Sequence, residues 1–399
     1  YSFLLAPSVE LSELPISLTE TKRLKKKNYF LGEGRKDWKP KQELLINNAN
    51  VTELFKRFRK HSIAEVEKNG HINPLRILSL SHIFPLNKFD TKKCVTRHFD
   101  HQTREALKSI ASNTKPEIKR MSGKAVAYCE NKANEENDDD DDSEKEEEKE
   151  EEKKGEGNES MLVMVKDLVD HTIHFRASAA NSSETTFTEK YLLPIIQRVL
   201  LKDASEDTIY TMIDKPESNN MKPDFMIGAK VRTKEVYFFF IEVKRPEATS
   251  KYQPEDDYTK LMKEMKCSVD TQLRLGVLNP TSLGVLVEGF KCTLFQMKLV
   301  SDGIYMPVAF DRFSLVKEIH QLVNLPSVVE AFYFVKVLIA KNNLSNNKIT
   351  NSIQSELEDF IEDVSKKRTK EEKRAGEKRI CSSFDTKFVS KKKTDEVNK

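Results

Sequence analysis

Three residues whose chemical types serve metal-dependent hydrolysis, Asp224, Glu242 and Lys244, lie beside strongly apolar sequence. Pro223 precedes Asp224, and the other two residues follow the β-branched and aromatic run 236–241. Carboxylates bind hard cations such as Mg²⁺, which keep several of their water ligands. An ammonium group near such a cation can orient a water molecule or a phosphate group. These residues therefore indicate metal-assisted chemistry on a phosphate ester.

The apolar run 236–241 is the element that must position two of these residues. Its sequence, VYFFFI, is typical of a central strand that is buried on both faces. Because side chains alternate along a strand, Glu242 and Lys244 leave from one face and Val243 from the other. Charged residues are rarely buried without a partner, so we expect a functional site where this strand ends.

The sequence from about 161 to 345 alternates helical and strand patterns, which predicts one packed α/β domain. A helix is expected over 185–202, with Ser182 or Ser183 as its cap and a kink at Pro194. Three strands that form a meander are expected next, at 208–213, 224–231 and 236–243. The remaining expected elements are a helix at 256–275 that ends at Gly276, strands at 284–288, 293–299 and 305–310, and an apolar helix at 328–340.

This order of elements, with an acid on the second strand and Glu-x-Lys on the third, resembles the PD-(D/E)XK nuclease superfamily. Pro223 and Asp224 stand at the Pro-Asp of that motif, and Glu242, Val243 and Lys244 fill its (D/E)XK positions. The resemblance covers residues from about 180 to 300. It implies a restriction-endonuclease-like core, which is a central mixed sheet flanked by helices.

The resemblance also implies a role for each residue of the motif. Asp224 and Glu242, with the carbonyl of Val243, would hold one or two Mg²⁺ or Mn²⁺ ions. Lys244 would orient or activate the attacking water, and Glu189 would be the acid that many members carry on the preceding helix. The implied reaction is in-line hydrolysis of a phosphodiester bond in nucleic acid, with DNA as the expected substrate.

Basic residues near the motif are candidates for contacts with the phosphate groups of a nucleic acid. Arg245, Lys222 and Lys251 are the main candidates, and Lys230 and Lys260 add further positive charge. Surface lysines also occur without any such role. A homodimer is a further expectation, because cutting both strands of a duplex commonly needs two sites.

Charge is strongly segregated along the 399 residues, although the net charge is only +3. Residues 135–159 contain 16 Asp or Glu and 4 Lys, whereas residues 22–60 contain 13 basic and 4 acidic residues. Residues 366–399 contain 13 basic and 6 acidic residues. We therefore expect four regions: a poorly ordered N-terminal region of uncertain fold (1–130), a disordered acidic linker (131–160), the nuclease-like domain (161–345) and a disordered basic tail (346–399).

The five cysteines are scattered and odd in number, which favours a reducing compartment over a disulfide framework. Basic clusters such as residues 22–27 and 366–368 are typical of nuclear import signals. We expect the protein in the nucleus, with the cytoplasm as the alternative. No stretch reaches the roughly 20 apolar residues of a membrane helix, so no membrane partner is expected.

Two other interpretations fit the same residues. In the first interpretation, the domain keeps the nuclease fold but has no catalytic activity. It then serves as a nuclear module that binds nucleic acid or acts as a scaffold. In the second, Glu242 and Lys244 form only an ion pair at the end of a strand, and no metal binds.

Overall fold

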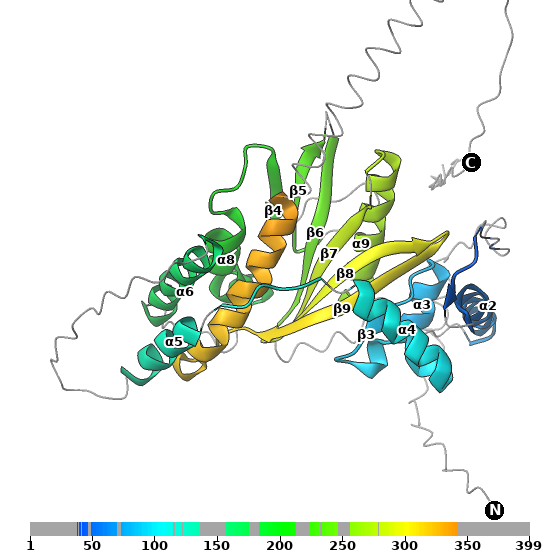
Figure 1. Cartoon of the computed structure of the whole chain (residues 1–399), viewed down its shortest axis with the longest axis horizontal. Helices are drawn as coiled ribbons and strands as arrows, with labels where there is room; N and C mark the ends of the chain where they lie inside the picture. Colours follow the sequence, from blue (N-terminus) through cyan, green and yellow to red (C-terminus); the bar gives the residue numbers. More distant parts are fainter. Residues whose placement is uncertain are drawn as a thin grey trace, which may run out of the picture. The chain divides into compact units, whose positions relative to one another are not determined.

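A seven-stranded mixed sheet in the order β3-β9-β8-β7-β6-β5-β4 is the centre of the computed structural model (Figure 1). The strands are β3 (Leu86–Asn87), β4 (Thr208–Met212), β5 (Phe225–Val231), β6 (Lys234–Lys244), β7 (Thr281–Glu288), β8 (Lys291–Ser301) and β9 (Ile304–Ser314). The structure describes residues 38, 40, 42–46, 49–69, 73–114, 116–121, 123–135, 156–174, 183–212, 223–231, 234–245, 256–277 and 279–340. The predicted α/β class, with helices around a mixed sheet, is confirmed.

Strands β4, β5 and β6 form the expected antiparallel meander. Helix α9 (Asp257–Arg274) then crosses over, so that β7 lies parallel to β6. Asp256 caps α9 by accepting a hydrogen bond from the backbone N–H of Thr259 at 2.8 Å. Gly276, which the sequence predicts as the end of this helix, has a φ of +77°.

The apolar side chains of β6 divide between two layers, as the sequence of this strand predicts. Phe240 packs with Leu261 and Met265 of α9. Phe239 and Val243 belong to the opposite layer, which contains the helices before β4 and after β9. Glu242 and Lys244 therefore leave β6 on the face that α9 covers.

The helix that precedes the meander is irregular. Ser183 caps its first segment, α7 (Glu184–Phe187), which continues into the π-helix η4 (Thr188–Leu192). Pro194 stands in the next segment, α8 (Leu193–Ile195), before a second π-helix, η5 (Ile196–Leu201). Proline removes one backbone donor, and widened turns are a common response to an interrupted hydrogen-bond ladder.

Three further segments complete the layer that contains Phe239. They are α6 (Glu156–His174), the 3₁₀ helix η6 (Ile319–Asn324) and a helix over residues 325–340. In the part of the chain that the structure describes, the helical span Ile319–Ala340 is long and apolar enough to cross a membrane, yet 56% of its most apolar window is buried in the protein. Core helices commonly have these properties.

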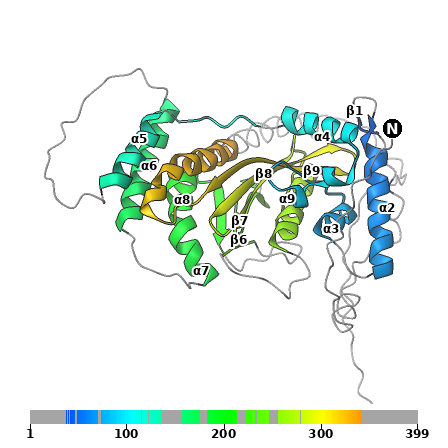
Figure 2. The same ribbon diagram turned by 90° about the horizontal axis from the view of Figure 1, so that it is seen from below.

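The described part of the N-terminal region, from residue 38 onward, packs against the sheet, whereas the sequence predicts a poorly ordered, separate region over residues 1–130. Strand β3 pairs in parallel with β9, and the described residues up to 340 belong to one compact unit. Figure 2 shows the helices α2, α3 and α4 gathered near β9. The elements of this part are β1 (Leu45–Ile46), β2 (Ala49–Asn50), α2 (Val51–Asn69), α3 (Pro74–Leu80), η2 (Thr91–Lys93), η3 (Val95–His98), α4 (His101–Thr114) and α5 (Gly123–Glu135).

These helices hold together because each contributes a few apolar residues to a shared core. Val51 and Phe55 of α2 pack with Leu75 of α3 and with Ile304 and Met306 of β9. The amphipathic pattern of residues 51–67 predicts a helix where α2 lies, whereas the other helices of this part were not predicted from the sequence. The ends of the predicted acidic linker, 131–135 and 156–160, are helical, whereas its centre and the basic tail lie outside the described residues.

Candidate functional site

Asp224 and Val243 are joined by a hydrogen bond where β6 extends beyond β5. The first residue of β5, Phe225, pairs with Ile241, so that the next residues of β6 have no strand partner on that side among the described residues. The backbone N–H of Val243 instead donates to Asp224 Oδ2 at 2.7 Å. The N–H and C=O groups of one strand residue point to the same side. The Val243 carbonyl therefore faces the side on which Asp224 lies.

Glu242 is buried, with 1% of its surface exposed, and pairs with a lysine from α9. Lys260 Nζ lies 2.8 Å from both carboxyl oxygens of Glu242 and donates a well-directed hydrogen bond to Oε2. Oε1 accepts no hydrogen bond of good geometry. Oε1 is thus in contact with Lys260 but retains the capacity to accept a further ligand.

A second buried carboxyl group, Glu264, stands one helical turn beyond Lys260. It has no exposed surface and lies within hydrogen-bonding reach of Glu242. Two carboxyl groups share a hydrogen bond only when one of them carries a proton. Glu242, Lys260 and Glu264 therefore form a buried carboxyl–ammonium–carboxyl group between β6 and α9.

The electrostatics of this group favour a protonated Glu242. Burial, reinforced by the negative charge of Asp224, raises the pKa of Glu242 to about 8. Burial also raises the pKa of Asp224, although the hydrogen bond from Val243 opposes this shift. Burial lowers the pKa of Lys260, but the hydrogen bond and attraction to Glu242, together with the charges of Glu264 and Asp224, outweigh that effect and the net pKa is raised. Lys260 thus stays charged while Glu242 gains a proton near neutral pH.

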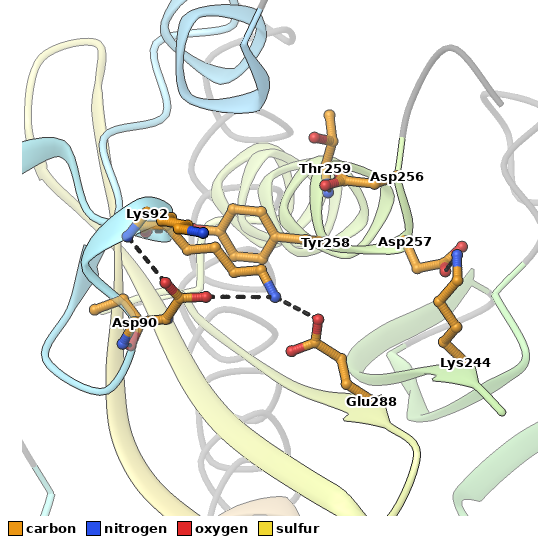
Figure 3. Close-up of polar contacts among 10 residues, drawn as sticks. Asp90, Lys92, Lys244, Asp256, Asp257, Tyr258, Thr259 and Glu288 are labelled. Carbon is orange, nitrogen blue, oxygen red and sulfur yellow. Dashed lines mark hydrogen bonds and ion pairs between the residues drawn. The ribbon is translucent and has the colours of Figure 1, made fainter. Parts of the chain in front are cut away.

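Lys244 lies on the same face of β6 and pairs with the first residue of α9. Its Nζ is 3.1 Å from Asp257 Oδ2. Figure 3 shows the side chains of Lys244 and Asp257 next to each other. The ion pair between Glu242 and Lys244 that the sequence allowed is thus replaced by two ion pairs with α9. The ammonium group of Lys244 is thereby held beside the end of the strand.

Glu184, on the helix that also carries the predicted Glu189, is a second acid near the site. The surrounding protein and the negative charges of Asp224 and Asp257 raise the pKa of Glu184, although the residue is exposed. Such repulsion requires proximity, so Glu184 belongs to the same charged group. Glu189 lies further along the helix on η4 and is exposed. The capping residue Ser183 fixes the first helical turn and hence the position of Glu184.

Only some of the residues predicted to contact phosphate groups lie in the part of the chain that the structure describes. Arg245 follows β6 and is exposed next to Lys244. Lys222 and Lys251 lie outside the described residues. Lys230 pairs in register with Glu235, at the end of β6 that is remote from the site. At about 3.3 Å per strand residue, Glu235 and Lys244 are roughly 30 Å apart, which removes Lys230 from the site.

The donors at this site suit a hard divalent cation. Two carboxylates and a backbone carbonyl supply oxygen atoms, and Mg²⁺ commonly uses one or two carboxylates and retains its waters. Among the described residues, no three His, Cys, Asp or Glu side chains are arranged to hold a metal ion. Asp224, Glu242 and Val243 therefore fit an ion that is mostly bound to water, and do not form a closed cage.

A cavity of about 280 Å³ lies elsewhere, among residues of α6, η4 and η6. Its lining includes His171, Lys190 and Tyr191, and none of the site residues described above. The charged group at the end of β6 is thus separate from this cavity.

The fold and the site define an α/β protein with a buried carboxyl–lysine centre at the end of a central strand. No protein-family model, curated protein or solved structure matches the chain. The geometry around Asp224, Glu242 and Lys244 is therefore what bears on function.

Proposed function

We propose that this protein is a metal-dependent nuclease that hydrolyses phosphodiester bonds, with a PD-(D/E)XK-type active site. The observation that carries the proposal is the junction of Asp224 with the backbone of Val243, between Glu242 and Lys244. It brings together an acid and the strand end that lies 19 residues further along the chain. The element order also supports it, because a helix, an antiparallel meander, a crossover helix and a parallel strand follow one another.

Each residue has a task in such a reaction. Asp224, Glu242 and the Val243 carbonyl would hold Mg²⁺ or Mn²⁺, which supplies a polarised water and offsets charge on the phosphoryl oxygens. Lys260 stabilises the deprotonated form of Glu242, which is the form that binds a cation. Lys244 would donate a hydrogen bond to the attacking water or to the phosphate group, while Asp257 holds its ammonium group in place.

A second candidate is an inactive nuclease-like module that binds nucleic acid. One observation favours it: Glu242 is almost fully buried and already has a protein cation, Lys260, at 2.8 Å. A carboxyl group that is satisfied in this way needs no metal for its stability. In this case the protein would bind nucleic acid without cutting it.

DNA as the substrate, a homodimer as the active form and a nuclear location belong to the same proposal. The basic clusters in the sequence support both a polyanionic partner and nuclear import, with the cytoplasm as the alternative location. No membrane partner is proposed.

The test uses the full chain, because β3 and the N-terminal helices belong to the same unit as the sheet. Linear, circular and single-stranded DNA, and RNA, would be incubated with the protein in Mg²⁺, Mn²⁺ or EDTA. Asp224→Asn is the informative variant, since an amide oxygen can still accept the Val243 hydrogen bond while the charge is lost. Lys230→Gln is the control, because Lys230 lies remote from the site.

Cutting that requires metal, persists in Lys230→Gln and is lost in Asp224→Asn would support the nuclease. Binding without cutting under all metal conditions would support the inactive module. A protein that neither binds nor cuts would contradict both functions.

A further inference from the structure

The loop of residues 88–97, called the basic loop below, brings positive charge to the site from a distant part of the sequence. It contains the four basic residues Lys88, Lys92, Lys93 and Arg97 and one acid, Asp90, which gives a local charge of 4 − 1 = +3. Lys88, Lys92 and Arg97 are exposed, whereas Lys93 is mostly covered.

Tyr258 attaches the basic loop to the first turn of α9. Its hydroxyl donates to the carbonyl oxygen of Lys93 at 3.0 Å, and the Lys93 ammonium lies 5.5 Å from the centre of the Tyr258 ring. Tyr258 is 2% exposed, so this anchor is a buried contact. The preceding residue on α9 is Asp257, the partner of Lys244. Consecutive residues of α9 thus hold the basic loop and the candidate catalytic lysine.

A second contact places the loop beside the end of the sheet. Lys93 Nζ lies 2.5 Å from Glu288 Oε1 and 3.8 Å from Asp90 Oδ2. Glu288 is the last residue of β7 and the register partner of Lys244 on β6. Neighbouring strands are about 4.8 Å apart, so Lys93 stands only one strand away from Lys244. Figure 3 shows Asp90, Glu288, Tyr258 and Lys244 around the start of α9.

Local hydrogen bonds hold the basic loop in one shape. Asn87 Oδ1 accepts from the backbone N–H groups of Phe89 and Asp90 at 2.9 and 3.1 Å. Asp90 Oδ1 then accepts from the N–H of Lys92 at 2.9 Å and so caps η2. A loop with this many internal bonds loses little conformational freedom when it meets a ligand.

Attachment of the loop requires Lys93 but not its exposed neighbours. Lys93 is paired with two carboxylates, whereas Lys92 is exposed and Lys88 is exposed with its ammonium group 4.8 Å from the centre of the Phe89 ring. A rigid row of exposed cations beside a phosphodiester site suits a chain of phosphate groups better than one compact anion.

We infer that the basic loop is a phosphate-contacting wall for the nucleic acid that occupies the site, on the β7 side of Lys244. The inference rests on the proposed function, because it names a surface next to that site and the class of polymer bound there. The contacts would be to the backbone and independent of base sequence.

The experiment measures binding of the full chain to a fluorescent DNA duplex in EDTA over a range of salt concentrations. In Lys88→Gln/Lys92→Gln, the slope of log Kd against log salt should fall by about two, one for each lost phosphate contact. Affinity at low salt should fall roughly tenfold or more. Lys230→Gln/Lys234→Gln is the matched control, since it removes the same charge at the far end of β6. Thermal unfolding of both variants checks that they remain folded.

A lower slope in the loop variant alone supports the inference. Equal slopes in wild type and loop variant, equal losses in the loop and control variants, or no duplex binding by wild type would each overturn it. Cleavage assayed separately in Mg²⁺ distinguishes the two proposals. Binding that depends on the loop, without any cleavage, would support the phosphate-contacting role of the basic loop and contradict the nuclease proposal. Cleavage with an unchanged Kd and KM in the loop variant would support the nuclease proposal and contradict the role of the basic loop.

Discussion

Glu242 and Lys260 meet across the interface between β6 and α9, with the ammonium nitrogen 2.8 Å from the carboxyl oxygens. Glu242 has a pKa of about 8 in the folded protein, against 4.5 for an ordinary glutamate. A carboxyl group with a raised pKa contributes most stability below pH 4.5, and that contribution is lost as the pH rises through 8. The stability of the wild type should therefore decline across this range.

Replacing Lys260 by Met should destabilise the protein much more at pH 9 than at pH 6. At pH 6 Glu242 is neutral, and the expected loss is about 1 kcal/mol for the hydrogen bond. At pH 9 the variant must bury an unpaired carboxylate or protonate it, for which the expected loss is roughly 3 kcal/mol. Denaturant unfolding at the two pH values measures the difference. Lys266→Met, which removes an i,i+4 pair with Asp270, should show no comparable pH dependence.

Mg²⁺ should bind more tightly as the pH rises towards 8, because the ion must displace a proton from Glu242. Below that pKa the affinity should increase about tenfold per pH unit. Calorimetric titration at pH 7 in two buffers with different heats of ionisation should show the release of close to one proton per ion. Glu242→Gln should lose this release, and an affinity that stays constant from pH 6.5 to 8 would contradict the role of Glu242 as a ligand.

Substitution of Glu184 should reduce cleavage much more than substitution of Glu189. Glu184 interacts with Asp224 and Asp257, so Glu184→Gln should reduce kcat/KM at least about tenfold, as expected for a group that acts in the transition state. Glu189→Gln should change it by less than about twofold, because Glu189 lies further along the helix, on η4. Steady-state kinetics on the best substrate measures both. The opposite ranking would restore the assignment made from the sequence.

Gly284 allows α9 to lie close to β7, and a larger residue should displace the helix that carries Lys260. A Cβ at this position would lie 2.7 Å from Met265 Sδ and 2.9 Å from Leu261 Cδ1. Gly284→Val should therefore lower the free energy of unfolding by about 2 kcal/mol through overpacking. The control is Gly123→Ala, where a Cβ meets nothing within 4 Å. Denaturant unfolding that shows equal effects for both would mean that α9 has room to shift.

The elements predicted well from the sequence are those whose signals are local. The β6 run has no polar interruption, so its burial on both faces and the alternation of Glu242 and Val243 could be read directly. Ser183 and Gly276 mark helix ends through hydrogen bonds and backbone geometry within a few residues. Pro223-Asp224 could be matched to the end of β6 because the meander that joins them is short.

The residues that sequence reasoning missed depend on packing between distant elements. Glu264 and the pairing of Lys260 with Glu242 require the rotation of α9 about its axis, and a helix as charged as α9 does not show which lysine faces inward. Glu184 was passed over because the uneven turns of α7 and η4 shift the face that meets β6. Lys260 and Glu264 are four residues apart, one helical turn, on the apolar side of α9. This spacing was the only feature of the sequence that could have indicated that both residues face β6.

The pairing of β3 with β9 also sets the order in which the chain can fold during synthesis. Leu86 cannot form its strand pair until Val308 has been synthesised, 308 − 86 = 222 residues later. At about 5–20 residues per second, the ribosome takes roughly 10 to 45 seconds to deliver that partner. Throughout this interval, Val51, Phe55 and Leu75 lack the β9 side chains that complete their core. The core formed by α2 and α3 thus stays incomplete, with apolar side chains exposed, until the last strand of the sheet is made.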